Sequence, residues 1–328
     1  MSQLLVLSHV AKNLPSVIAG RIKRGPLRPT WSFGFEVVIN AMRSLSAEIS
    51  EHSWVEQRKL YDAIAPRWSP IWKKIGRRPT TIDGIEGEWF EPKDPPEPVD
   101  TVVLYLHGGG YVFGSTVSHA ELIARIAYAC PARVLAPNYR LAPEHPFPAA
   151  IDDAVKCFEH LLASGVDPKK IVVAGDSAGG ALSVALMLRL RDGKRPLPAG
   201  AALLCPWAEL RSTTSSMTEH EAYDWGTAAL LDRWADIYLA GHDRTDPLAS
   251  PVHADLSGLP AMLVQVGGSE LLLDQATLLA ERARKQGTDA RLVVEPDMIH
   301  DWHSFAGVFP HCGRAIDDIG AFVREVVR

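Results

Sequence analysis

The stretch from Lys170 to Leu190, KIVVAGDSAGGALSVALMLRL, decides the fold. Its first five residues are an apolar run typical of a buried strand, and residues 178–190 are typical of a helix. Between them, GDSAG matches the pattern G-x-S-x-G, and in a strand–turn–helix context this pattern holds a serine with its Oγ exposed. The glycines fit because a Cβ in so tight a turn would clash with neighbouring chain. Ser177 is therefore the candidate nucleophile. A phosphate-binding loop would need a Gly-Lys-Ser/Thr ending, and a plain Gly-rich turn is the remaining alternative.

Short apolar runs alternate with helical stretches on both sides of this segment. We expect strands at residues 101–106, 133–136, 170–174, 201–205, 261–266 and 291–294. We expect helices at residues 118–129, 149–163, 178–190, 274–286 and 312–327. Such alternation predicts an α/β fold with a mostly parallel central sheet flanked by helices. Residues 36–75 and 209–246 have helical spacing without clear strands, and the second segment reads as an insertion between two strands.

A second motif, His107-Gly108-Gly109-Gly110, directly follows the expected strand 101–106. It matches the HGGG loop, whose backbone N–H groups stabilise a developing oxyanion. We predict Gly109 and Gly110 as donors together with Ala178, and Gly108 is a near alternative. His107 is expected to shape the loop and not to act as the base.

If the chain is an α/β-hydrolase, the base and the acid are expected later in the chain, because the triad order in that fold is Ser, acid, His. His300 lies in a loop that leaves the last expected strand, and we predict it as the base, with His303 as the alternative. Glu270 follows the end of strand 261–266 and is the predicted acid. Asp274 is the alternative, but its position at a helix start is explained by capping alone.

These motifs together resemble the hormone-sensitive lipase family of α/β-hydrolases, which includes the bacterial family IV esterases. The matching residues are His107–Gly110, Asn138–Glu144 (NYRLAPE), Gly175–Gly180 (GDSAGG), Asp246–Pro251 (DPLASP) and Met298–His300. The resemblance covers about residues 80–328 and implies an α/β-hydrolase fold with a helical cap. It implies that Glu270 stands where many members have aspartate, and that Glu144 and Asp176 are structural.

The resemblance also implies an activity and a domain division. The implied activity is that of a serine carboxylesterase for short- to medium-chain acyl esters, working through an acyl-enzyme. The alternatives are an amide, carbamate or lactone substrate, or a receptor without catalysis. The implied catalytic domain comprises residues 81–208 and 247–328. The cap consists of residues 1–80 and 209–246, and Trp31, Trp207, Tyr223 and Trp225 are candidate walls of its pocket.

The amino-acid composition excludes several classes of protein and of partner. The 328 residues are 47% hydrophobic and 22% charged, which excludes a disordered or coiled-coil chain. A net charge of −5 argues against nucleic acid as a partner. Residues 1–80 carry 13 Lys or Arg against 5 Asp or Glu, but these are dispersed, as on a solvated helical subdomain.

Four scattered cysteines and the lack of a recognisable secretory signal or membrane span lead us to expect a cytoplasmic protein. We expect no cofactor and no metal, although His300, Asp301 and His303 would suit a metal by residue type. The resemblance implies a homodimer.

Overall fold

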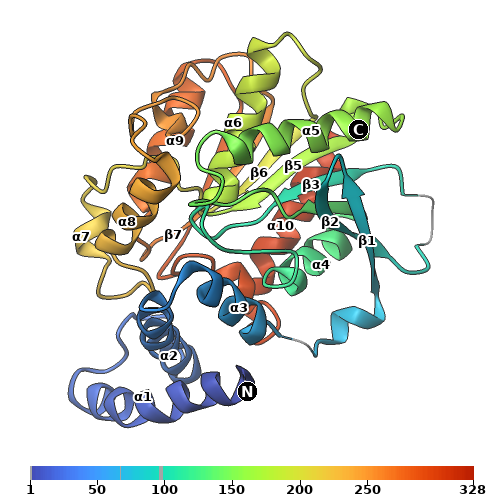
Figure 1. Cartoon of the computed structure of the whole chain (residues 1–328). Coiled ribbons are helices and arrows are strands. Elements are labelled where there is room, and N and C mark those ends of the chain that lie inside the picture. Colours follow the sequence, from blue (N-terminus) through green and yellow to red (C-terminus); the bar gives the residue numbers. More distant parts are fainter. Residues whose placement is uncertain (1, 67, 96–98) are drawn as a thin grey trace.

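An eight-stranded sheet forms the centre of the molecule (Figure 1). The computed structural model describes residues 2–66, 68–95 and 99–328. The strands are β1 (Ile75–Ile82), β2 (Ile85–Pro92), β3 (Val102–Leu106), β4 (Arg133–Pro137), β5 (Ile171–Asp176), β6 (Gly200–Leu204), β7 (Ala261–Gly267) and β8 (Ala290–Glu295). Their order is β1-β2-β4-β3-β5-β6-β7-β8, and only the β1–β2 and β2–β4 pairs are antiparallel. The prediction of a mostly parallel sheet is confirmed.

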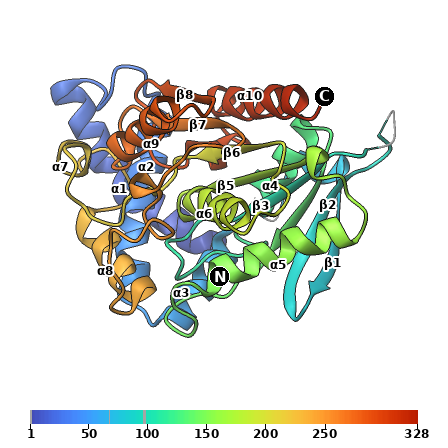
Figure 2. The same cartoon turned by 90° about the horizontal axis from the view of Figure 1, so that it is seen from above.

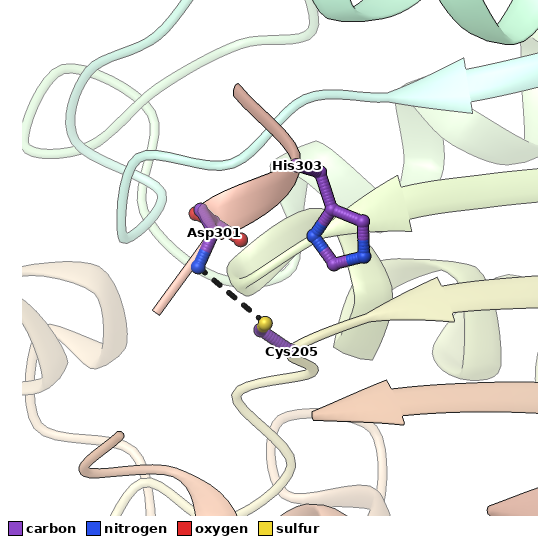
Figure 3. Close-up of side chains that lie close together, drawn as sticks. All are labelled: Cys205, Asp301 and His303. Atoms are coloured by element: carbon purple, nitrogen blue, oxygen red, sulfur yellow. Dashed lines mark hydrogen bonds between the residues drawn. The ribbon is translucent and has the colours of Figure 1, made fainter. Parts of the chain in front are cut away.

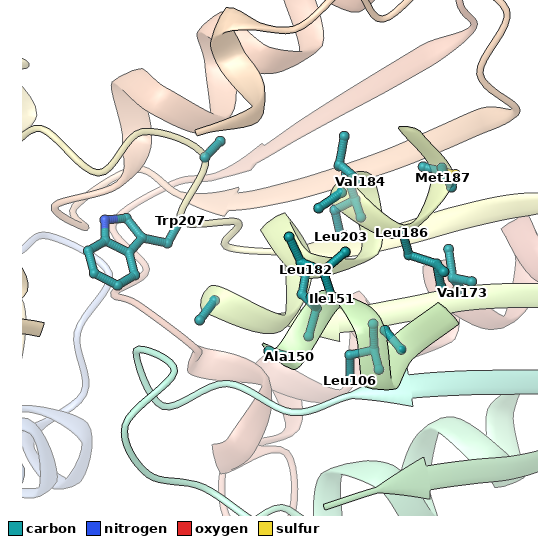
Figure 4. Packing of buried hydrophobic residues seen from close by; sticks show 14 of the residues in the cluster. Leu106, Ala150, Ile151, Val173, Leu182, Val184, Leu186, Met187, Leu203 and Trp207 are labelled. Atoms are coloured by element: carbon teal, nitrogen blue, oxygen red, sulfur yellow. The ribbon is translucent and has the colours of Figure 1, made fainter. Parts of the chain in front are cut away.

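Helices cover both faces of the sheet. They are α4 (Ala120–Ala129), α5 (Ala149–Ala163), α6 (Ala178–Asp192), α9 (Leu273–Lys285) and α10 (Pro310–Val326). Successive side chains of a strand point to opposite faces. Leu104 and Leu106 therefore join a core with α5, α6 and α9, while Val103 and Tyr105 join a core with α4 and α10. Figure 4 shows part of the first core, in which Leu182 and Leu186 of α6 pack beside the strands.

The remaining helices lie together at one end of the sheet (Figures 1 and 2). The N-terminal group is α1 (Ser2–Arg24), α2 (Phe33–Ser50) and α3 (Trp54–Ile64), and the insertion supplies α7 (Ser216–Glu219) and α8 (Ala228–Leu239). The two groups touch, because Arg233 of α8 lies 5.0 Å from the Trp54 ring of α3. One-turn 3₁₀ helices connect other elements: η1 (Pro70–Lys73), η2 (Pro168–Lys170), η3 (Pro251–His253) and η4 (Trp302–Phe305).

The N-terminal region differs in detail from the prediction of one helical segment over residues 36–75. Ser32 caps α2, and a reciprocal capping box of Ser53 and Glu56 starts α3, so the segment divides into two helices. A further helix, α1, precedes them, and the expected boundary at residue 80 falls inside β1. In the described part of the chain, no helix combines the length and hydropathy needed to cross a membrane.

Candidate active site

Ser177 sits at the turn between β5 and α6, as the motif predicts. Its backbone has φ 54° and ψ −120°, a conformation that L-residues rarely adopt. The turn is held because Ser177 N–H donates to Leu204 O at 2.8 Å, while Ser177 O accepts from Trp207 N–H at 2.9 Å. The close packing requires glycine nearby, since a Cβ on Gly179 would lie 1.8 Å from Leu106 O. Ser177 is thus presented at the carboxyl end of the central strand β5.

The HGGG loop lies against this turn, and the structure separates its three glycines. Gly108 N–H donates to Asp176 Oδ1 at 3.0 Å, so this N–H is already used. Gly109 and Gly110 have φ values of 110° and 58°, which only glycine adopts easily. Within the described residues, neither of their N–H groups has a hydrogen-bond acceptor. The geometry therefore favours Gly109 and Gly110 over Gly108 as oxyanion donors.

The side chains of His107 and Asp176 hold the HGGG loop in place. The His107 ring stacks on Tyr139 at 4.2 Å, and burial lowers the pKa of His107 to about 3. Asp176 also accepts from Tyr105 OH at 2.5 Å and pairs with His119 Nε2 at 3.2 Å. Burial opposes its ionisation, but His119 and Tyr105 lower the pKa of Asp176 to about 2. Neutral His107 and ionised Asp176 thus hold the loop, in agreement with the motif for His107 and with the family resemblance for Asp176.

Helix α3 also holds this loop, through the side chain of Arg58. Arg58 Nε donates to Val112 O at 2.8 Å, and its Nη2 donates to Ala142 O at 2.7 Å. Both Nη atoms also bind Glu144, at 3.0 and 2.7 Å. One helical turn after Arg58, the ring of Tyr61 stacks on the ring of Phe113, with the ring centroids 4.2 Å apart. The family resemblance implies a structural role for Glu144, but its arginine partner lies 86 residues away and was not predicted.

His300 and Glu270 meet at the carboxyl edge of the sheet. His300 Nδ1 lies 3.1 Å from Glu270 Oε1, and Glu270 Oε2 accepts from Gly267 N–H at 2.7 Å. Both side chains are buried, Glu270 completely. A carboxylate at Nδ1 orients the ring and assigns proton transfer to Nε2, which lies 3.3 Å from Asp301 Oδ2.

The alternative residues have other partners. Asp274 Oδ2 accepts from Ser216 N–H at 2.9 Å, which joins α9 to α7 and leaves Asp274 away from His300. His303 Nε2 lies 3.0 Å from Gln265 Oε1, and burial lowers the pKa of His303 to about 3. The geometry therefore favours Glu270 as the acid and His300 as the base.

Two further carboxyl groups, which the sequence did not indicate as parts of the catalytic site, surround His300. Asp224, from the insertion, accepts from His300 N–H at 3.2 Å and from Leu271 N–H at 2.9 Å. It thus joins the loop of His300 to the loop that carries Glu270. Asp301 places Oδ2 3.3 Å from His300 Nε2. Adjacency to His300 could have pointed to Asp301, but no sequence signal links Asp224 to a loop 76 residues away.

These carboxyl groups set the charge state of the site. Burial alone would lower the pKa of His300, but Asp301, Glu270 and Asp224 together raise it above its ordinary value. Burial raises the pKa of Asp224 to about 6. The surroundings therefore stabilise a protonated imidazole, the species formed when a serine hydroxyl loses its proton.

A narrow apolar recess opens beside His300, with a volume of about 20 Å³. It lies between helix α8 and the loop of Glu270 and is lined by Trp225, Leu230, Leu231, Trp234 and Leu271. Of the four aromatic residues suggested by the sequence, Trp225 lines this recess. Trp31 and Trp207 are buried in packed cores, and Tyr223 packs under Arg28 at 4.7 Å.

Comparison with known proteins agrees with this geometry. A family model described as alpha/beta hydrolase fold matches residues 103–304. An acetyl-hydrolase of Streptomyces hygroscopicus is 41% identical over 291 residues, covering 85% of this chain and 95% of that protein.

Solved structures of esterases are also similar to this chain. An esterase from the bacterial hormone-sensitive lipase family superposes with a TM-score of 0.83 at 40% identity, covering 88% of this chain and 98% of that one. The structure of EstE5 soaked with p-nitrophenyl butyrate superposes with a TM-score of 0.80 at 35% identity, covering 87% and 98% of the two chains.

Proposed function

The chain belongs to the hormone-sensitive lipase family of α/β-hydrolases and is a carboxylic ester hydrolase, and we propose that Ser177, His300 and Glu270 are its catalytic triad. The observation that carries this proposal is the 3.1 Å contact of His300 Nδ1 with Glu270 Oε1 at the sheet edge where Ser177 is presented. The proposed mechanism is acyl transfer in two steps.

In the first step, Ser177 Oγ attacks the ester carbonyl carbon while His300 Nε2 accepts the hydroxyl proton. The negative charge on the carbonyl oxygen is stabilised by N–H groups of Gly109, Gly110 and Ala178, the last at the N-terminus of α6. His300 then protonates the leaving alcohol, and an acyl-serine remains. In the second step, His300 deprotonates a water molecule that attacks the acyl-serine, and the proton passes on to Ser177 Oγ as the acyl–oxygen bond breaks and the acid leaves.

We propose short- to medium-chain acyl esters as substrates. The apolar lining of the recess beside His300 supports an acyl chain as its occupant, and a relative named acetyl-hydrolase supports a short one. We expect kcat/KM for p-nitrophenyl esters to be highest for acetate to butyrate and to fall for long acyl chains. A rise toward laurate or palmitate would contradict the proposed class. Amide, carbamate and lactone analogues belong in the same kinetic screen.

The assignment of the acid gives a prediction with a built-in control. Glu270→Gln cannot stabilise the imidazolium of His300, so kcat should fall about 10³-fold or more. Asp274→Asn is the matched change, since Asp274 contacts Ser216 instead of His300, and kcat should stay within about threefold of the original. Steady-state kinetics on p-nitrophenyl acetate measure both. The reverse ranking would assign the acid to Asp274.

The clamp of Arg58 on the oxyanion loop gives a second prediction. Arg58→Ala removes the hydrogen bonds to Val112 O and Ala142 O, so the loop donors should lose their fixed position. We expect kcat to fall about tenfold or more with little change in KM, because the donors act mainly on the transition state. Lysine cannot replace the planar guanidinium fork, so Arg58→Lys should restore little activity.

Arg77→Ala is the control for this experiment. Arg77 also donates two hydrogen bonds to a glutamate, at 2.8 and 2.6 Å. This glutamate is Glu88, and the pair lies on the β1–β2 hairpin. An equal loss of kcat in both variants would mean that Arg58 has no particular role in positioning the loop.

We also propose that the part of residues 1–80 that precedes β1 and residues 209–246 act together as a cap over the site. The recess lined by α8 and the clamp from α3 support this division. A homodimer and a cytoplasmic location stay predictions, and light scattering of the purified protein checks the first.

A further inference from the structure

Three side chains with metal-binding atoms converge beside the proposed triad (Figure 3). Cys205 directly follows β6, Asp301 follows His300, and His303 lies in η4. One ligand atom of each lies within 4.8 Å of the others. The parallel sheet explains the convergence, since the carboxyl ends of parallel strands meet at one edge.

Two of these ligand groups have free capacity. His303 is completely buried, and its Nε2 is used by Gln265, but its Nδ1 has no hydrogen-bond partner among the described residues. In Figure 3 one ring nitrogen of His303 faces Asp301 and Cys205. Asp301 Oδ1 is also buried without a partner in the described chain. A buried, unpaired polar atom costs about 1–3 kcal/mol, so a ligand that engages both of these atoms would be stabilised here.

We propose that Cys205, Asp301 and His303 bind a divalent transition-metal ion, and that Zn²⁺ suits them best. Thiolate, imidazole and carboxylate are the usual protein ligands of Zn²⁺, and three of them with one open position make a common tetrahedral arrangement. Binding forms an S–Zn bond and releases the thiol proton of Cys205 to solvent. Harder ions such as Mg²⁺ and Ca²⁺ prefer oxygen ligands and should bind poorly.

A second combination, Cys205 with Glu270 and His300, also lies within 4.8 Å. Its ligand atoms are less available, because Glu270 Oε1 and His300 Nδ1 already contact each other and Glu270 Oε2 accepts from Gly267 N–H. The free atoms of Asp301 and His303 therefore favour the first combination.

Occupation of this site should inhibit the esterase. Asp301 Oδ2 lies 3.3 Å from His300 Nε2, so an ion bound to Asp301 places positive charge next to the base. Positive charge there disfavours the imidazolium that proton transfer from Ser177 requires. Zn²⁺ is thus an inhibitor and not a cofactor of the hydrolysis.

The test uses the full chain after treatment with EDTA and dialysis. ZnCl₂ is titrated against a chromophoric chelator to measure binding, and in parallel against p-nitrophenyl acetate hydrolysis to measure inhibition. We expect one Zn²⁺ per chain and inhibition that EDTA reverses. His303→Gln, whose amide can still donate to Gln265, should raise the Zn²⁺ concentration for half-inhibition about tenfold or more. His145→Gln, which changes an exposed histidine, should leave it unchanged.

Three results would overturn the proposal. The first is no stoichiometric binding by the original chain. The second is equal Zn²⁺ sensitivity of the original chain and His303→Gln, which would place the ion on Glu270 and His300 or on the surface. The third does not depend on any variant: Co²⁺ added to the original chain should produce thiolate-to-metal charge-transfer absorption, and its absence would exclude Cys205 as a ligand.

Discussion

Replacement of Ser177 by alanine is expected to lower kcat for p-nitrophenyl acetate at least about 10⁴-fold. The change removes the only atom that we propose to form the acyl bond, while the oxyanion donors and the recess remain. The backbone at Ser177 has φ 54°, which alanine tolerates as poorly as serine, so the fold should be retained. Steady-state kinetics and a thermal melt of the same preparation measure the two effects separately.

Ser183→Ala is the matched control for this variant. Ser183 is also completely buried in α6, but its Oγ only donates to Gly179 O at 2.8 Å within the helix. Its removal should cost little stability and keep activity within about threefold. Full activity of the Ser177 variant would exclude the proposed mechanism.

Gly179→Ala is expected to have the largest effect on stability. The added Cβ would lie 1.8 Å from Leu106 O and 2.6 Å from His107 O, so β3 and α6 would have to separate. Overpacking of a close-packed interior usually costs about 1–3 kcal/mol, and a clash with two backbone oxygens should reach at least the upper value. Because the shift displaces both Ser177 and the oxyanion loop, activity should be lost together with stability.

Gly313→Ala provides the comparison. Gly313 lies in α10, and a Cβ there meets nothing within 4 Å. Alanine should stabilise this helix by up to about 1 kcal/mol. Urea unfolding measures both variants, with soluble yield as the readout if the Gly179 variant does not accumulate. A Gly179 variant as stable as the original would contradict the described packing of the turn.

The central part of the fold could be predicted because its signals are local. A buried strand, a G-x-S-x-G turn and a helix follow one another within residues 170–190, and the HGGG loop directly follows its strand. Hydrophobic runs and turn chemistry suffice to recognise such units. The expected strands and helices from residue 101 onward are each found within a few residues of their predicted bounds.

The choice between neighbouring residues needed the structure. Gly108, Gly109 and Gly110 are equivalent in sequence, and the structure distinguishes them by the contact of Gly108 N–H with Asp176 Oδ1 and by the positive φ of the other two. Glu270 and Asp274 are four residues apart, and their partners, His300 and Ser216, are distant in sequence.

The supporting contacts of the site were missed for the same reason. Asp224 reaches the His300 loop across 76 residues, and Arg58 reaches Val112 across 54. Tertiary packing alone creates such contacts, and neither residue lies in a motif. The free nitrogen of His303 is equally invisible in the sequence, because it depends on which ring atom Gln265 occupies.

Labelling with a fluorophosphonate probe tests the nucleophile most directly. The probe is added to the full chain, the protein is digested, and the modified peptide is sequenced by mass spectrometry. We predict a single phosphonylated residue, Ser177, and loss of esterase activity in proportion to the label. Modification of another residue with equal loss of activity, or full inactivation with Ser177 unmodified, would contradict Ser177 as the nucleophile.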